Sequence, residues 1–225
     1  MCRFIGSIVL NILLNSPGAV VVVTATNVDV YLYMVRKCEG IPDGSQLFFR
    51  QSVDDCNVVS VKRTSSRLGA QKCSVLAFLY VLAGSQVTPY ISHIGPQKML
   101  NKLFASDELI QNALLMIDGA GDISMHHVKQ VASNFYATVE DHLIRSSSVS
   151  SLAELSYTNH LARSDKVDKK LLISHIPPTK SIINNHVKRC LFVFAMLYVD
   201  SVSHVNDVEQ YGFVLKNDFY IPQWY

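Results

Sequence analysis

The sequence has few charged residues: Asp, Glu, Lys and Arg make up 17% of its 225 positions, and the formal net charge is +2. Dedicated nucleic-acid-binding domains carry a clear excess of basic residues. This balance excludes a broad basic surface, so any binding to nucleic acid must come from a local patch. Hydrophobic residues make up 49% of the chain, which indicates a folded protein with a substantial core.

Several motifs of known chemistry are also absent. The five cysteines form no CxxC pair and no Cys/His cluster, which argues against zinc and indicates reduced thiols in a nuclear or cytoplasmic protein. The sequence contains no GxSxG elbow, P-loop or dinucleotide fingerprint. No segment approaches the roughly 18 unbroken apolar residues of a membrane span, so we expect no membrane association.

The first residues, MCRFIGSIVLNILLNSPGA, share one positive charge, an apolar run and a small-residue end with secretory signal peptides. Asn11 and Asn15 interrupt that run, however, and the VVVVT that follows has the composition of a core strand. A short helix over residues 4–15, followed by a Pro17-Gly18 turn, accounts for the same letters. We therefore predict a nuclear or cytoplasmic protein, with secretion as the alternative.

The first half of the chain combines strand and helix patterns. The β-branched run AVVVVTA (19–25) predicts a strand buried on both faces of a parallel sheet. Residues 29–35 fit either a second extended segment or a helix. The segments QLFFRQ (46–51) and NVVSVKR (57–63) predict two adjacent strands or a hairpin, and QKCSVLAFLYVLA (71–83) predicts a buried helix.

The second half is mainly helical in pattern, with predicted helices at 97–104, 107–117, 124–145, 151–163 and 180–199, the last capped by Thr179. The predicted fold class is α/β, with a mostly parallel central sheet flanked by helices and a helical C-terminal half. We expect two domains. Residues 1–145 would form the α/β core, including a helix-turn-helix segment at 71–104, and residues 146–225 a helical extension packed on it.

The segment ISHIGPQKML (91–100) has the composition of a loop that presents a helix N-terminus to a phosphate. Gly95 allows a tight turn and Pro96 suits the first helical turn, whose free N–H groups favour an anion. The predicted residues binding the DNA backbone are Ser92, His93, Gly95, Gln97, Lys98 and Lys102. A plain corner between two helices, with solvent-exposed lysines, explains the same letters.

Residues 73–103 resemble the helix-two-turn-helix region of flap endonucleases and related 5′ nucleases, a superfamily with a PIN-like fold. Residues 19–33 resemble the strand of that family that ends in two aspartates. The chain is more similar still to uncharacterised proteins of animal mobile elements, which carry DTDV, GCDTTS and PPT…H…R motifs. The last motif is matched here by Pro177-Pro178-Thr179, His186 and Arg189.

The resemblance implies two-metal hydrolysis of phosphodiesters, for which a cluster of carboxylates holds Mg²⁺ or Mn²⁺. Position by position, the expected catalytic aspartates fall on Asn27, Asp29 and Gln86, so Asp29 is the surviving carboxylate and the one candidate metal ligand. The N-terminal strand of the family has no counterpart. One carboxylate cannot organise two Mg²⁺ ions. The predicted function is therefore a degenerate, inactive 5′-nuclease-like protein that needs no cofactor and binds DNA weakly, without sequence specificity.

Two alternatives stay open at this point. The chain is either a protein-interaction scaffold that binds a protein partner and no nucleic acid, or a residual nuclease that depends on Mg²⁺ or Mn²⁺ at Asp29. His186 and Arg189, one helical turn apart, either support the fold or contact nucleic acid.

Overall fold

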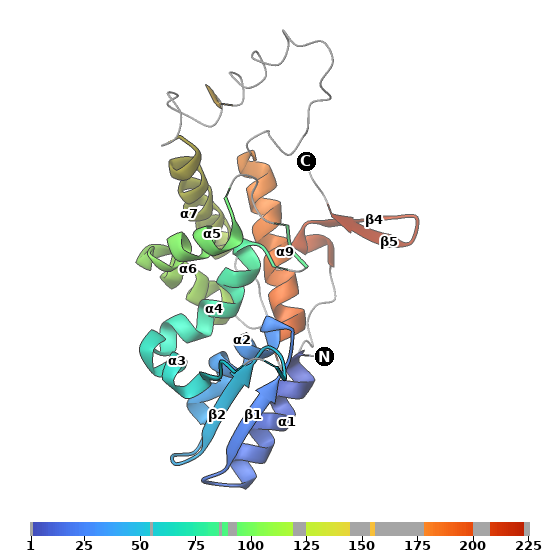
Figure 1. Ribbon diagram of the computed structural model, residues 1–225. Coiled ribbons are helices and arrows are strands. Elements are labelled where there is room, and N and C mark those ends of the chain that lie inside the picture. Colours follow the sequence, from blue (N-terminus) through green and yellow to red (C-terminus); the bar gives the residue numbers. More distant parts are fainter. Residues whose placement is uncertain are drawn as a thin grey trace. The chain divides into compact units, whose positions relative to one another are not determined.

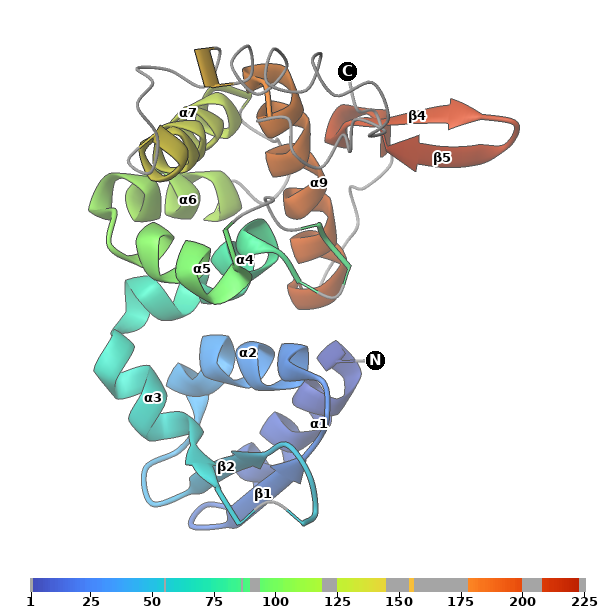
Figure 2. The same cartoon turned by 45° about the horizontal axis from the view of Figure 1, so that its top comes forward.

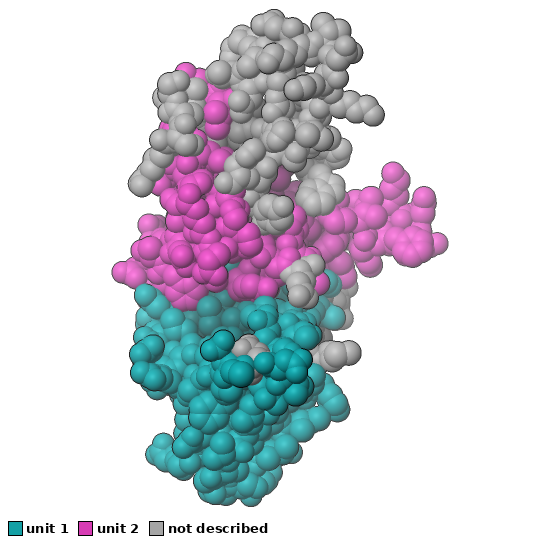
Figure 3. All heavy atoms as spheres, in the orientation of Figure 1, with its two compact units in different colours: residues 1–79, 192–206 teal, residues 80–191, 207–225 magenta. Residues whose placement is uncertain are grey.

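The computed structural model describes residues 2–54, 56–85, 87–89, 94–118, 125–144, 154–155, 178–199 and 208–222. The chain divides into two compact units, coloured separately in Figure 3: unit 1 (residues 1–79 and 192–206) and unit 2 (residues 80–191 and 207–225). Helices α4 (Ala70–Ala83) and α9 (Lys180–Tyr198) contribute residues to both units. The predicted domain boundary at 145/146 lies outside the described residues, so that division stays a prediction.

Unit 1 is a small α/β unit. Its strands are β1 (Val20–Thr24), β2 (Gln46–Arg50) and β3 (Val59–Ser60), and its helices, besides parts of α4 and α9, are α1 (Cys2–Asn15), α2 (Val28–Lys37), the 3₁₀ turn η1 (Cys38–Gly40) and α3 (Val61–Leu68) (Figure 1). The strand order is β1-β2-β3, with β1 parallel and β3 antiparallel to β2. The segment β1-α2-β2 is therefore a β-α-β crossover.

Helices cover one face of this sheet, as Figures 1 and 2 both show. The covered face includes the buried side chains of Val23, Leu47 and Phe49. On the opposite face Val20 is 62% exposed and Val22 48%. The prediction that this strand is buried on both faces is wrong, because no second helical layer among the described residues covers that face.

Local capping decides two segments that the sequence pattern left ambiguous or misassigned. Residues 29–35 belong to helix α2, which begins where the Asn27 side chain accepts a hydrogen bond from the Asp29 N–H. The predicted strand over 57–63 is limited to Val59–Ser60, because the Ser60 hydroxyl accepts from the Arg63 N–H at 3.2 Å and starts α3 at Val61.

Unit 2 contains the predicted helices of the second half. Their observed bounds, besides α4 and α9, are α5 (Pro96–Phe104), α6 (Asp107–Asp118) and α7 (Met125–Ile144). Thr179 caps α9 as predicted, since its hydroxyl accepts from the Ile182 N–H at 3.3 Å. The predicted helix at 151–163 lies largely outside the described residues. A core of apolar side chains joins these helices, with Met99, Leu109, Val128, Phe135 and Val187 among them.

The C-terminal part, predicted as helical, also contains a short strand pair. After the 3₁₀ turn η3 (Val208–Tyr211), strands β4 (Phe213–Lys216) and β5 (Phe219–Pro222) form an antiparallel hairpin. Its turn residues Asn217 and Asp218 have positive φ angles of 50° and 63°, as a tight hairpin turn requires. The coarse prediction of a mixed α/β fold is confirmed, whereas the small sheets of the described residues do not amount to a central, mostly parallel sheet.

No helix in the described parts of the chain is both long enough and apolar enough to cross a bilayer.

Candidate functional site

The first candidate site, around Asp29, lies at the start of α2 in unit 1. Asn27 is the N-cap of this helix, and its Oδ1 accepts from the Asp29 N–H at 2.8 Å. Its amide oxygen, which the metal hypothesis would offer to a cation, is therefore engaged in capping. Asp29 is 5% exposed and lies in the first helical turn, where the helix dipole favours a carboxylate.

The Asp29 carboxylate is bonded to a side chain that sequence reasoning did not identify. The hydroxyl of Tyr198, the last residue of α9, donates to Asp29 Oδ1 at 2.5 Å. Arg36, at the other end of α2, donates from Nη1 to the Tyr198 carbonyl oxygen, and its guanidinium lies 5.1 Å from the centroid of the Phe194 ring. The two charged ends of α2 thus hold Tyr198 by its hydroxyl and by its carbonyl.

This arrangement ties Asp29 to a buried aromatic side chain. Tyr198 is fully buried, and its ring stacks on Phe194 with centroids 5.7 Å apart. A buried carboxylate needs a donor, and the phenol supplies it. Within the described residues no three His, Cys, Asp or Glu side chains gather closely enough to hold a metal ion.

Gln86, the third position to which the resemblance assigns an acid, lies outside the described residues, so its relation to Asn27 and Asp29 stays a prediction. Its neighbours close the C-terminal end of α4. The Thr88 hydroxyl donates to the Val81 carbonyl oxygen at 2.6 Å, and the Ser85 N–H lies 3.0 Å from that same hydroxyl oxygen. Gly84 has φ +115°, a conformation that suits glycine. This part of the predicted helix-turn-helix segment is therefore a helix cap.

The second candidate site is the N-terminus of α5, part of the predicted DNA-backbone loop. Gly95 is the N-cap, makes no side-chain capping bond, and is followed by Pro96 at the first helical position, as predicted. Gly95, Gln97 and Lys98 are exposed. The N–H groups of Gln97 and Lys98 belong to the first turn, where helix geometry provides no acceptor. Ser92 and His93 lie outside the described residues.

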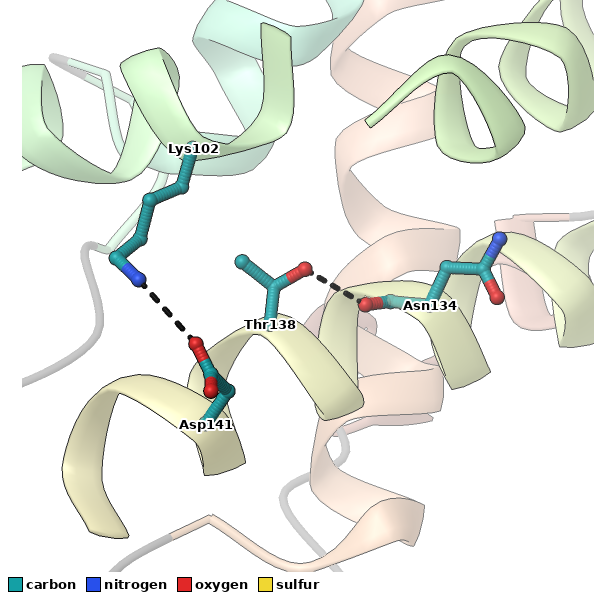
Figure 4. Close-up of polar contacts among 4 residues, drawn as sticks. All are labelled: Lys102, Asn134, Thr138 and Asp141. Atoms are coloured by element: carbon teal, nitrogen blue, oxygen red, sulfur yellow. Dashed lines mark hydrogen bonds and ion pairs between the residues drawn. The ribbon is translucent and has the colours of Figure 1, made fainter. Parts of the chain in front are cut away.

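Lys102, the second predicted lysine, is engaged with an acid. Its Nζ lies 3.5 Å from Asp141 Oδ2 on α7, while Thr138 bonds back to the Asn134 carbonyl oxygen one turn away (Figure 4). The Lys102 side chain is 26% exposed and that of Asp141 45%. Part of the positive charge expected beside the α5 N-terminus is therefore offset, and Lys98 is the more available of the two lysines.

His186 and Arg189 lie in the interior of unit 2, which favours the structural alternative for both. The ring of His186 stacks on Phe135, and its Nε2 lies 3.0 Å from the Leu82 carbonyl oxygen. Burial lowers the pKa of His186 to about 4, so the ring is neutral at physiological pH and donates from Nε2. Arg189 is 6% exposed and donates to the Gly212 carbonyl oxygen.

Unit 1 contains a polar cavity of about 430 Å³, lined by Cys38, Cys73 and Lys62 among others. Burial raises the pKa of Cys38, so its thiol stays protonated at neutral pH, and the thiolate is the nucleophilic form. Among the described side chains, Cys38, Cys56, Cys73 and Cys190 are free thiols, and Cys56 is the exposed one.

Comparison with known proteins identifies no relative: no family model matches the chain, and neither a curated protein nor a solved structure is significantly similar to it.

Proposed function

We propose that this protein binds the phosphate backbone of DNA without hydrolysing it, through the N-terminus of α5. The observation that carries the proposal is an exposed helix start with no side-chain cap, at which Gly95, Gln97 and Lys98 face solvent. First-turn N–H groups and the positive end of the helix dipole favour an anion. A lysine beside them adds an attraction that ignores base sequence.

The resemblance of residues 73–103 to the helix-two-turn-helix of 5′ nucleases supports DNA as the ligand. In this proposal the β1-α2-β2 unit corresponds to part of the mostly parallel, PIN-like sheet of that superfamily. The contact would be weak, because a single lysine and a few amides neutralise little of the backbone charge. A mobile-element origin belongs to the same proposal.

The absence of hydrolysis follows from how the two described acid positions are used. Asp29 Oδ1 accepts from the Tyr198 hydroxyl and Asn27 Oδ1 accepts from the Asp29 N–H, so each of the two side chains already commits one oxygen to a contact within the protein. Two-metal chemistry needs several carboxylates at one place. Of the three positions to which the resemblance assigns a carboxylate, only Asp29 has one.

The test is fluorescence anisotropy with labelled duplex, single-stranded and 5′-flap DNA, titrated at several salt concentrations. We expect Lys98→Glu to weaken binding to all three alike and to reduce the slope of log K against log salt by about 1. Lys129→Glu is the matched control, because Lys129 is also exposed, lies on α7 and makes the same charge change away from α5.

Equal binding by wild type and Lys98→Glu, with an unchanged salt slope, would rule out the α5 site. Equal losses in Lys98→Glu and Lys129→Glu would point to nonspecific charge attraction instead.

A second candidate function, a protein-interaction scaffold, is favoured by the β4–β5 hairpin. Both of its faces expose apolar side chains, with Val214 and Ile221 on one and Leu215 and Tyr220 on the other. An isolated two-stranded hairpin is marginal in water, so exposed apolar faces of this kind indicate a contact surface. Undetectable DNA binding, together with a complex that Leu215→Lys dissolves, would select this function.

A further inference from the structure

Strand β1 leaves one edge open within the described residues, because its one partner is β2. The Ala19 carbonyl oxygen accepts from the Gln46 N–H at 2.9 Å, and the Ala25 N–H donates to the Arg50 carbonyl oxygen at 3.1 Å. Backbone groups alternate in direction along a strand, so Val20, Val22 and Thr24 direct their N–H and C=O groups away from β2. These three residues form the β1 edge, and all are exposed.

The β1 edge carries none of the devices by which proteins protect an open strand. It contains no proline, no bulge and no charged side chain, and β-branched residues make up the whole strand. Such an edge is a template for another extended chain.

We propose that two copies of this chain associate by antiparallel pairing of their β1 edges. The two-fold axis passes through Val22, so that Val22 faces Val22 of the second copy and Val20 faces Thr24. In this register all three residues on each side exchange both backbone hydrogen bonds, because hydrogen-bonded antiparallel pairs occur at every second residue. An isologous interface requires such a register, because the two-fold axis exchanges the two copies and each must contribute the same residues.

Helix α1 adds an apolar stripe at the same end of unit 1. Phe4, Ile8 and Ile12 recur at four-residue spacing and are 70%, 45% and 48% exposed. Helix α1 contacts β1 and α2, and α2 contacts α3, which lies against β2 and β3. The helices therefore follow the order of the strands, which places α1 beside the open edge. Its buried side holds Val9 and Leu13, so the stripe faces away from α2.

The charge pattern favours a second copy over an unrelated peptide. Residues 4–28 contain no Asp, Glu, Lys or Arg, so the joined surfaces bury no charge and oppose no like charges. The nearest charged side chain on the exposed sheet face, Arg50, donates to the Thr24 hydroxyl at 2.8 Å. The two-fold axis at Val22 sends the two copies of Arg50 to opposite ends of the paired strands.

The area available also suits a dimer. Five exposed apolar side chains are available, namely Phe4, Ile8, Ile12, Val20 and Val22. If a whole side chain is counted as somewhat under 200 Å², their exposed parts amount to roughly 500 Å² per copy. Complete burial of these side chains in two copies would amount to about 1,000 Å², the lower bound for a specific interface, before any backbone contribution.

The experiment measures the mass of the whole chain by sedimentation velocity and light scattering over a range of micromolar concentrations. We expect a concentration-dependent dimer. Val22→Lys and Val22→Glu each place two like charges face to face on the axis, and each should raise the dimer dissociation constant at least about tenfold. An equimolar mixture of the two variants should restore the dimer, because the introduced ammonium of one chain then faces the introduced carboxylate of the other.

The control is Phe219→Lys, which introduces a charge at a 73% exposed position of the β4–β5 hairpin and should leave the dimer unchanged. Far-UV circular dichroism checks folding, and Ile12→Lys on the α1 stripe is a second variant should Val22→Lys misfold. A wild type that is monomeric throughout, or dimers insensitive to both substitutions, would overturn the proposal. A mixture that fails to associate would overturn the antiparallel register, and dissociation by Phe219→Lys would assign the contact to the hairpin.

Discussion

Replacing Tyr198 by Phe tests whether Asp29 is a structural residue or a metal ligand. The substitution removes one oxygen and leaves the ring, which stacks on Phe194, in place. The Asp29 carboxylate then stays 5% exposed but loses the hydroxyl that donates to its Oδ1. Since Arg36 binds the main-chain carbonyl oxygen of Tyr198, that contact is retained in the variant.

The expected loss of stability follows from the burial of both groups. A hydrogen bond to a charged group contributes about 1.5–3 kcal/mol, and a buried acceptor left without its donor bears the desolvation penalty. We therefore expect Tyr198→Phe to lower the free energy of unfolding by about 2 kcal/mol. Asp29→Asn should cost a similar amount, and the double variant should cost less than the two together, because both changes remove one interaction.

The assay is urea unfolding followed by circular dichroism, with and without Mn²⁺. If Asp29 is structural, Mn²⁺ does not shift the wild-type midpoint, and 5′-flap DNA stays intact at high protein concentration. A ligand that binds the folded state would raise stability by RT ln(1 + [L]/Kd). Stabilisation by Mn²⁺ that disappears in Asp29→Ala, together with an unchanged midpoint in Tyr198→Phe, would refute the structural role and restore the metal hypothesis.

Two further predictions concern unit 2. Because burial lowers the pKa of His186 to about 4 from the ordinary 6.5, the unfolded chain takes up a proton first as the pH falls. The neutral His186 ring therefore contributes stability that is complete above pH 6.5 and is lost between about pH 6.5 and pH 4, by roughly 3 kcal/mol. In urea unfolding across that range, the free energy of unfolding of His186→Gln should decline less steeply than that of the wild type. Asp141→Asn should strengthen DNA binding severalfold and steepen its salt dependence, because Lys102 loses its acidic partner. Unchanged affinity in that variant would show that Lys102 lies outside the contact.

Helices were the most predictable elements, because apolar periodicity and capping are local signals. The α4 run and the Thr179 cap of α9 were predicted correctly from neighbouring residues. Two local signals were missed. Ser60 starts α3 within a segment that resembles a strand, and Asn217-Asp218 between β-rich segments is a hairpin turn.

The local backbone features of the candidate site were predictable from the sequence, but the tertiary contacts of its side chains were not. The exposed α5 start follows from Gly95 and Pro96 being adjacent, since both act on their own backbone. The engagement of Lys102 by Asp141 and of Asp29 by Tyr198 joins residues far apart in the chain, and no spacing rule connects them.

The sequence by itself determined where most helices begin and end and that the chain carries little charge. Helix propensity and capping act within a few residues, and composition needs no structure at all, so the sequence is sufficient to predict these features. The tertiary structure alone decided that the Asp29 carboxylate meets a phenol and that, among the described residues, β1 keeps one edge and one face open. Both outcomes depend on which distant segment packs alongside, and burial is a property of that packing rather than of any single stretch of chain.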